Sequence, residues 1–376
     1  MIYLDHAASA FPKAPGVAEE AARFLREDAG NPGRGAHALA RRASDAVERT
    51  RQGLALLLGV PDAARLALTS GATEGLNVAL RGLLPVGARA LVGPEAHNSV
   101  LRPLSVLARE RGVVVEEVRS DDALRWDLDD LEARLRAGPC ALVVVGHGSN
   151  VTGALQDLVG IAARARAAGA RVLVDGAQTV GAVPVPLDAV DVLAFSGHKA
   201  LLGPPGTGGL WVRTGIELPP LRVGGTGSQS EREEPPSALP GALEAGTPNA
   251  VGFAALGAAV DWLRAEGPAT LAARARAAGN ALRAGLAELP GVRVCSGGEE
   301  DLPVVSFVAE GWDVQELAAV LDHHGVAVRA GLHCAPRAHR RLGTAPGGTL
   351  RASAGPFVDA AAIEEVLSVL ASLLAG

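Results

Sequence analysis

The sequence contains very little lysine. Of its 35 basic side chains, only Lys13 and Lys199 are lysine, and the rest are arginine. A reaction that needs an amine nucleophile, such as Schiff-base formation, therefore has only two candidate residues. Lys13 follows Phe-Pro near the N-terminus and is expected to be a solvated loop residue. Lys199 lies between an apolar run and a glycine-rich turn, and it is the stronger candidate.

Cysteine is scarce too, with Cys140, Cys295 and Cys334 in scattered segments and no C-x-x-C pair. This odd, dispersed set argues against a disulfide framework and a structural zinc site, so we expect no bound metal. Such cysteine usage fits a reducing cytoplasm. Cys140 and Cys295 border apolar runs and are expected in the core, whereas Cys334 stands in the loop sequence RAGLHCAP.

Long apolar runs and clusters of positive charge are absent as well. No segment approaches the ~18 apolar residues that a membrane helix needs. The N-terminus reaches acidic Asp5 without the basic and apolar regions of a signal peptide. A formal net charge of −6 without a basic tract gives no general attraction to nucleic acid or anionic lipid. We therefore expect a cytoplasmic protein without nucleic-acid or membrane partners.

Short apolar runs alternate with amphipathic helical segments through the first two thirds of the chain. That alternation predicts an α/β fold with a largely parallel sheet. A large domain is expected over residues 14–248, ending in an irregular connection at 213–248 that suggests function or an interface. Residues 249–376, with 1–13, are expected to form a smaller α+β domain. The predicted strands are RLALT, ARALV, GVVVEEV, CALVVVG, RVLVD, VDVLAF and GGLWV in the large domain, then VRVC, PVVSFV and VAVRA.

Polar side chains follow four of the predicted strands at their carboxyl ends. In α/β sheets, ligands bind in the crevice beyond those ends. Packing alone does not explain four strands that each end in reactive side chains, so we expect the functional site here. The residues are His97 and Asn98, then His147, Ser149 and Asn150, then Asp175 and Gln178, and finally Ser196, His198 and Lys199.

These residue types suit pyridoxal 5′-phosphate (PLP). PLP needs a lysine for its Schiff base and an acid beside its pyridine nitrogen, which Lys199 and Asp175 supply. Its phosphate suits a helix N-terminus, which is expected at Ser70–Thr73 in the sequence SGAT. Each residue alone has a structural alternative, because Asp175 could cap a helix and His97 could be a surface loop residue. The combination with a nearly unique lysine favours the PLP hypothesis.

Several motifs resemble those of one enzyme family. VDGAQ, with Asp175 and Gln178, and FSGHK, with Lys199, are similar to the class V aminotransferases, a group of fold-type I PLP-dependent transferases. LDHAAS, NPGRGAH, TSGATEGLN, HGSNVTG and EAGTPN extend the resemblance over nearly the whole chain. RAGLHCAP followed by LRAS resembles the cysteine desulfurases and selenocysteine lyases. Relatives often carry Asn or Ser where His6 stands, and a second histidine where Leu332 stands.

The resemblance implies a role for each matching residue. Lys199 would carry PLP as a Schiff base, and Cys334 would accept sulfur. A homodimer is implied, with Thr247 reaching the cofactor of the neighbouring subunit. The other cofactor-binding residues would be Asp175 at the pyridine nitrogen, Gln178 at the ring oxygen, His97 stacked on the ring as a catalytic residue, and Ala72, Thr73, Ser196 and His198 at the phosphate. Substrate would be bound by Asn150 and Arg351, with His37 as a further candidate.

The function that follows is PLP-dependent cysteine desulfuration, in which L-cysteine becomes L-alanine and its sulfur is transferred to Cys334 as a persulfide. Neighbouring positive charge lowers a thiol pKa, and Arg329 and His333 are expected to provide it for Cys334. A sulfur-acceptor protein is a possible partner. The alternatives are a selenocysteine lyase, another class V aminotransferase, or a non-catalytic PLP-binding protein that handles sulfur.

Overall fold

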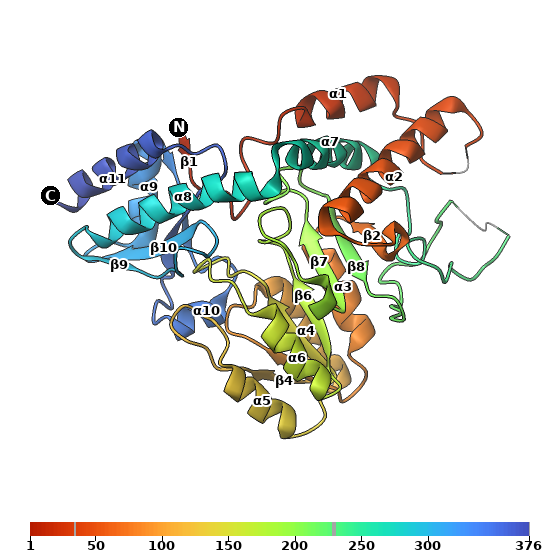
Figure 1. Cartoon of the computed structure of the whole chain (residues 1–376), viewed down its shortest axis with the longest axis horizontal. Coiled ribbons are helices and arrows are strands. Elements are labelled where there is room, and N and C mark those ends of the chain that lie inside the picture. The colour runs from red at the N-terminus through yellow and green to blue at the C-terminus, as the bar shows by residue number, and fades with distance from the viewer. Residues whose placement is uncertain (34, 228–230, 376) are drawn as a thin grey trace.

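A seven-stranded sheet forms the centre of the large part of the molecule (Figure 1). The structure is a computed structural model that describes residues 1–33, 35–227 and 231–375. The strand order is β2-β8-β7-β6-β5-β3-β4, and all neighbours are parallel except where β8 pairs with β2 and β7. The predicted α/β fold with a largely parallel sheet is therefore confirmed. The strands are β2 (Leu66–Thr69), β3 (Arg89–Val92), β4 (Val114–Glu117), β5 (Leu142–Gly146), β6 (Arg171–Asp175), β7 (Val192–Ser196) and β8 (Gly208–Val212).

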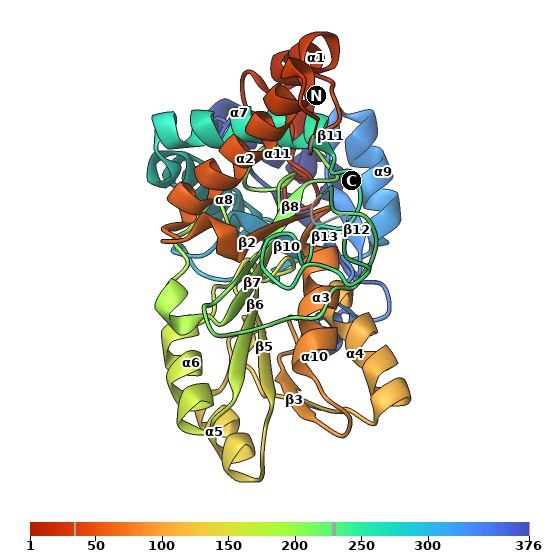
Figure 2. The same cartoon turned by 90° about the vertical axis from the view of Figure 1, so that its right-hand side faces the viewer.

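Helices cover both faces of this sheet, which explains why its strands are apolar runs rather than alternating ones. Figure 2 shows α3 (Ala72–Leu83) and α4 (Asn98–Arg111) on one side, with α5 (Leu128–Arg136) and α6 (Leu158–Ala167) on the other. Successive strand residues point to opposite faces. On β5, for example, Val144 joins the core under α3 and α4, while Val143 and Val145 join the core under α5 and α6.

Three further helices, α1 (Val17–Glu27), α2 (Ala38–Leu58) and α7 (Ala250–Glu266), pack together at one end of the sheet. Phe253, Leu256 and Val260 of α7 belong to the same core as the sheet. α7 therefore packs with the large part of the molecule, although the predicted boundary near residue 248 assigns it to the smaller domain. That boundary remains a prediction.

A second, antiparallel sheet of order β12-β13-β10-β9 lies in the C-terminal part. The N-terminal strand β1 (Ile2–Tyr3) pairs with β11 (Val326–Ala327), so the start of the chain lies against this part. The remaining strands are β9 (Val292–Val294), β10 (Val304–Ala309), β12 (Arg329–Gly331) and β13 (Thr349–Ser353), and the helices are α8 (Pro268–Ala287), α9 (Val314–His323), α10 (Pro336–Arg341) and α11 (Ala360–Leu374).

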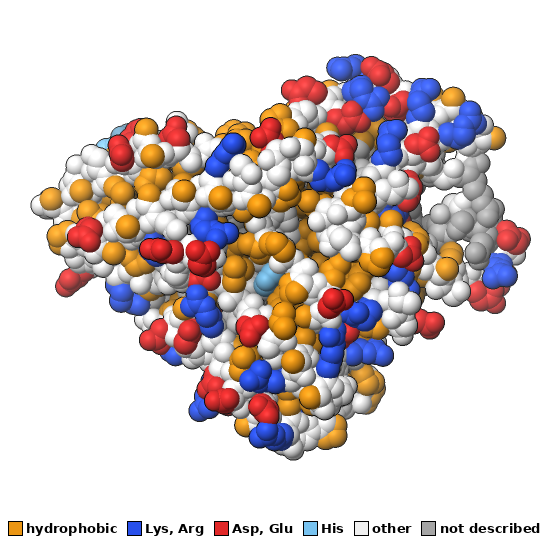
Figure 3. Space-filling model, in the orientation of Figure 1, with side chains coloured by type: hydrophobic (Ala, Val, Ile, Leu, Met, Phe, Trp, Pro, Cys, Tyr) orange, Lys and Arg blue, Asp and Glu red, His pale blue; other side chains and the backbone are white. Residues whose placement is uncertain are grey.

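The sequence did not predict β13, because Arg351 interrupts its apolar pattern although the whole strand is buried. The described residues of 213–248 contain no helix or strand, as predicted. On the face shown in Figure 3, acidic and basic side chains are interspersed, without a large area of one sign. Within the ranges that the structure describes, no helix is both long and apolar enough to cross a membrane.

Candidate active site

A pocket of about 240 Å³ lies beyond the carboxyl ends of β3, β5, β6 and β7. The register places these ends level, since Gly146 of β5 pairs with Asp175 of β6, which pairs with Ala194 of β7. The C-terminal part closes the pocket with residues from β12, β13 and the loop between them. The predicted residues that line it are Ala72, Thr73, His97, Asn150, Asp175, Gln178, Ser196, His198, Lys199, Cys334 and Arg351.

Lys199 and Asp175 bring opposite charges to this pocket. Enclosure by the protein lowers the pKa of the Lys199 amine to about 8, and the carboxylate of Asp175 partly opposes that shift. Asp175 is 8% exposed and accepts a hydrogen bond from the backbone N–H of Ala177 at 3.0 Å. Asp175 therefore holds the following turn, but it caps no helix, because no helix follows β6 directly. The negative charge of Asp175 also raises the pKa values of Lys199 and His97, which opposes the effect of burial on both side chains.

The N-terminus of α3 forms a cradle of hydrogen-bonding groups. Gly71 precedes the helix with a φ of 146°, and the Ser196 hydroxyl accepts the N–H of Ala72 at 3.0 Å. Thr73 and Ser99 share a hydroxyl hydrogen bond of 2.8 Å. Nδ1 of His198 is buried without a partner. A helix N-terminus surrounded by hydroxyls and an unpartnered ring nitrogen fits a phosphate group, so the residues present fit PLP.

His97 is held at the start of α4. Its Nδ1 accepts a hydrogen bond from the Ser99 N–H at 3.0 Å, so the ring caps this helix while it lines the pocket. Burial lowers the pKa of His97, although Asp175 opposes this. A neutral ring fixed at one nitrogen is suited to contact with a flat ligand, because its orientation is set before the ligand arrives.

Cys334 lies in a loop with an unusual backbone. His333 and Cys334 have φ values of 46° and 57°, in the left-handed region that residues other than glycine rarely adopt. Two hydrogen bonds of 2.7 Å hold the loop, one from the Asn98 N–H to the Cys334 carbonyl and one from Asn150 Nδ2 to the His333 carbonyl. The Cys334 thiol is thus exposed on a supported loop at the edge of the pocket.

The expected electrostatic role of His333 is wrong. Its Nε2 lies 3.0 Å from the Thr349 hydroxyl and 3.1 Å from the Thr349 carbonyl. Burial, with the nearby charge of Arg351, lowers the pKa of His333 to about 2, so the ring is neutral and gives Cys334 no positive charge. Arg329 lines the pocket, and its Nε lies 3.3 Å from Asp5.

Arg351 is 2% exposed, and such burial of a guanidinium requires partners. It donates to Asp5 Oδ1 at 2.8 Å and to the Asn150 carbonyl at 3.0 Å, while its Nε is buried without a partner. Sequence analysis did not assign Asp5 to the site, although the motif LDHAAS contains it. Asn150 also serves a second purpose, because its amide supports the cysteine loop.

The residues expected at the site that fall outside this pocket are Asn98, His147 and Ser149, which follow strands, and His37 and Thr247. His37 is exposed and caps α2 by accepting the Ala40 N–H at 3.2 Å, and Thr247 is exposed before α7. Neither residue lines the pocket within this chain. The prediction that Lys13 is solvated is wrong, because it is half-buried and donates to Ser9 Oγ at 3.1 Å and to the His198 carbonyl at 3.4 Å. Lys13 therefore contacts the backbone of His198, the residue that precedes Lys199.

Glu95 is a pocket residue that sequence analysis missed. It is 3% exposed, and its carboxylate accepts from Trp126 Nε1 at 2.8 Å and from the Gly146 N–H at 3.2 Å. Burial nevertheless raises its pKa to about 7. In sequence it is an ordinary acid in a loop, and only the fold brings Trp126 to it. No group of three His, Cys, Asp or Glu side chains arranged for a metal occurs in the described part of the chain.

Acid is expected to destabilise the folded protein through its buried histidines. Burial lowers the pKa values of His6, His147, His198 and His339 to about 4, and that of His333 to about 2. Their unfolded pKa is about 6.5, so the unfolded chain binds more protons below that pH, and the stability that they contribute is lost as pH falls toward 4. Glu95 acts in the opposite direction, because its raised pKa favours the folded state below pH 7.

Five histidines outweigh one carboxyl, and the free energy of unfolding should fall by at least about 3 kcal/mol from pH 7 to pH 5. Urea unfolding of the protein at both pH values measures this difference. Equal stability at pH 7 and pH 5 would mean that the histidines are not held neutral in the folded state.

Comparison with known proteins agrees with this geometry. The chain matches the family Aminotransferase class-V over residues 2–366. A probable cysteine desulfurase of Vibrio cholerae is 31% identical over 98% of this chain and 93% of its own length. The cysteine desulfurase CsdA of Escherichia coli is 34% identical over 95% of this chain and 90% of its own length. Both relatives are thus matched over nearly their full lengths.

Solved structures give the same result. The apo structure of a cysteine desulfurase from Thermococcus onnurineus superimposes with a TM-score of 0.93 at 30% identity, covering 100% of this chain and 95% of that one. The structure of E. coli CsdA, described as its S-sulfonic acid, gives a TM-score of 0.89 at 30% identity and covers 99% and 94% of the two chains. The similarity therefore includes both the large and the small sheet.

Proposed function

This chain belongs to the class V aminotransferase family, and from that premise we infer that it is a PLP-dependent cysteine desulfurase that converts L-cysteine to L-alanine. The observation that carries the inference is the meeting of Lys199, Asp175 and Cys334 in one pocket, although they come from different parts of the fold. An enclosed amine, a carboxylate and an exposed thiol are the groups that this reaction requires.

PLP would be held by the residues whose contacts suit its parts. When bound, PLP supplies the electron sink that stabilises negative charge on the substrate Cα. We propose that Lys199 attaches it, that Asp175 faces the pyridine nitrogen, that Gln178 faces the ring oxygen and that His97 packs on the ring. Ala72, Thr73, Ser196 and His198 would bind the phosphate, with Thr247 of a second subunit.

We assign the remaining steps of the reaction to the side chains of Lys199 and Cys334. Because the pKa of Lys199 is lowered to about 8, roughly a tenth of its amine is neutral at pH 7 and able to take the substrate Cα proton. The Cys334 thiolate would attack the substrate sulfur. A sulfur–sulfur bond would then form and the substrate Cβ–sulfur bond would break, with that electron pair kept by Cβ. Cβ would be protonated to become the methyl group of alanine, Lys199 would return a proton to Cα, and Cys334 would keep the sulfur as a persulfide.

The position of Cys334 also bears on partners and location. Its exposure at the pocket edge suits transfer of the persulfide sulfur to an acceptor protein. We propose that the enzyme is a homodimer, since Thr247 lies outside the pocket of its own chain. A nucleophilic thiol must stay reduced, so we propose a cytoplasmic location.

The test is to supply the holoenzyme with L-cysteine and, separately, with L-selenocysteine, and to measure alanine. Comparable or faster alanine formation from cysteine supports the desulfurase function. Alanine from selenocysteine with almost none from cysteine would identify a selenocysteine lyase. Transfer of the amino group to a 2-oxo acid would identify an aminotransferase, and bound PLP without turnover would identify a non-catalytic protein.

Asn150→Ala should slow desulfuration by roughly tenfold while PLP stays bound, because the hydrogen bond to the His333 carbonyl that supports the cysteine loop is lost. The rate at which iodoacetamide alkylates Cys334 should also change, which loss of a substrate contact alone would not cause. Asn280→Ala is the matched control, since its amide donates to the Glu299 carbonyl at 3.1 Å, away from the pocket. An unchanged alkylation rate in Asn150→Ala would contradict the supporting role.

A further inference from the structure

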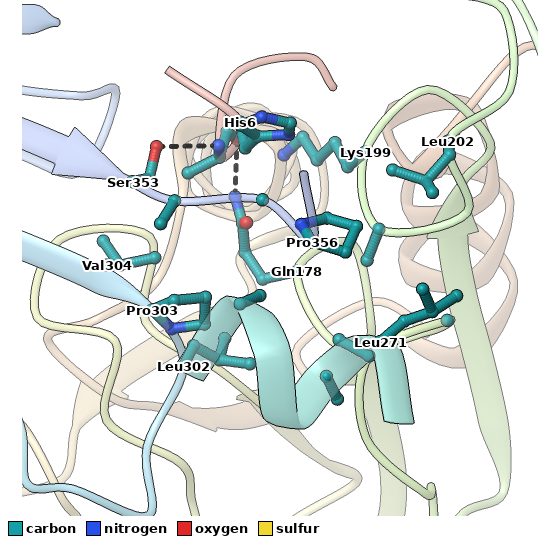
Figure 4. Close-up of a pocket in the computed structure, with 18 of the residues that line it drawn as sticks. His6, Gln178, Lys199, Leu202, Leu271, Leu302, Pro303, Val304, Ser353 and Pro356 are labelled. Carbon is teal, nitrogen blue, oxygen red and sulfur yellow. Dashed lines mark hydrogen bonds between the residues drawn. The ribbon is translucent and has the colours of Figure 1, made fainter. Parts of the chain in front are cut away.

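A second cavity adjoins the active-site pocket, and Figure 4 shows residues that line it. Its volume is about 80 Å³, and it shares Ala7, Gln178 and Lys199 with the pocket. Figure 4 shows His6 and Lys199 together at one end, with Leu271 and Leu302 on other sides. The cavity therefore adjoins the side chain that we propose attaches the cofactor, on a side that the proposed reaction does not use.

The walls of this cavity are almost entirely apolar. They come from the N-terminal segment, from the turns after β6 and β7, from α7 and α8, from the start of β10 and from the end of β13. Two of the polar lining groups are already engaged, since Gln178 Nε2 donates to the Ala7 carbonyl at 2.9 Å and Ser353 Oγ accepts the Ala7 N–H at 3.0 Å. The apolar lining residues are Leu202, Leu263, Leu271, Leu302, Pro303, Val304 and Pro356, with several alanines.

Two further polar residues line the cavity, Lys199 and His6. His6 is 8% exposed, and its Nε2 is buried without a hydrogen-bond partner. Gly355 packs directly against the ring, since a side chain at that position would overlap it. The ring is therefore fixed in place beside the cavity, and its Nε2 is left without a partner. A buried polar atom without a partner costs about 1–3 kcal/mol, which a bound molecule could recover.

We propose that this cavity binds a small uncharged molecule with an apolar body and one hydrogen-bonding group, of the class of short-chain thiols and alcohols. His6 Nε2 provides the hydrogen bond, and the leucine and proline side chains surround the body. An engineered apolar cavity of about 150 Å³ accepts benzene, so this smaller one takes a smaller molecule. A charged molecule is disfavoured, because apart from Lys199 the largely apolar walls would replace little of its hydration. The bound molecule would contact Lys199 and so change the surroundings of its amine.

The test uses the holoenzyme with two probes, xenon and ethanol. Xenon has no hydrogen-bonding group, whereas ethanol has one. Crystals pressurised with xenon should show the atom beside Leu271, and ethanol should give saturation-transfer NMR signals from the bound form. An empty or water-filled cavity under both probes overturns the proposal.

Two substitutions on α8 make the test specific. Ala272 lines the cavity, whereas Ala273 beside it on the same helix is exposed. Ala272→Leu should weaken binding of both probes at least tenfold, whereas Ala273→Leu should leave binding unchanged. Equal binding in Ala272→Leu would place the probes elsewhere and overturn the proposal. The absorbance of bound PLP and the unfolding temperature show whether Ala272→Leu is correctly folded.

His6→Phe tests the hydrogen bond to His6 separately from the volume of the cavity. It keeps a ring of similar shape but removes Nε2, so ethanol binding should weaken several-fold while xenon remains bound. If both probes bind as in the original protein, His6 is not the anchor and the proposal is overturned. Alanine formation from cysteine, measured in parallel, reports on the reaction itself, so failure of the proposed function is distinguishable from failure of this site.

Discussion

Cys334→Ala is expected to reduce alanine and sulfide formation from L-cysteine by at least about 10³-fold, while the absorbance of bound PLP is unchanged. Cys334 is the exposed thiol that lines the pocket, whereas Cys140 and Cys295 are 5% and 6% exposed. Burial also raises the thiol pKa of both core cysteines, which disfavours their thiolates. Neither can substitute for Cys334 as nucleophile.

Cys295→Ala is the matched control for this experiment, because it removes one thiol outside the pocket. Its desulfuration rate should stay within about twofold of the original. Mass spectrometry after one turnover should find an added sulfur atom on the peptide that contains Cys334 and on no other. If Cys334→Ala retains more than a tenth of the original rate, the sulfur acceptor is another nucleophile, such as an added thiol.

Lys199→Ala is expected to abolish covalent attachment of PLP and to lower turnover by at least about 10³-fold. The reason is that Lys199 lies beside Asp175 in the pocket with a lowered amine pKa, whereas the Lys13 amine is engaged with Ser9 and the His198 carbonyl. Treatment of the holoenzyme with borohydride should fix PLP on the Lys199 peptide. The variant should release all its PLP under denaturing conditions after the same treatment.

The paucity of lysine makes this measurement unusually clear. Lys13→Arg leaves Lys199 as the single lysine of the chain, and PLP should still be fixed there. PLP fixed on the Lys13 peptide of Lys199→Ala would contradict the assignment, because it would show that the half-buried lysine serves as a second attachment site. In neither variant does another lysine exist to confuse the assignment.

Much of the large sheet could be predicted from sequence, because its strands are buried on both faces and read as apolar runs. The position of the pocket could be predicted from the same apolar runs. His97, Asp175 and Lys199 each stand just after such a run, and the parallel order brings the strand ends to one edge. The motif around Cys334 placed that residue at the site even though it comes from the C-terminal part.

The remaining features depend on contacts between distant segments. β13 was missed because Arg351 breaks its pattern, and the partner that permits its burial, Asp5, is at the other end of the chain. Lys13 looks solvated in sequence, since nothing local predicts its contact with His198. The neutrality of His333 follows from the depth at which Thr349 and Arg351 enclose it. Such burial is a property of the assembled molecule.

Because the sequence contains two lysines, the outer surface of the protein carries almost no lysine amines. Lys13 is half-buried, and Lys199 lines the pocket. Free PLP is an aldehyde and labels exposed lysines of many proteins indiscriminately. Here such labelling has little to react with, so an excess of cofactor during reconstitution should still give close to one PLP per chain. The same property would leave amine-coupled dyes or solid supports few lysine side chains to react with.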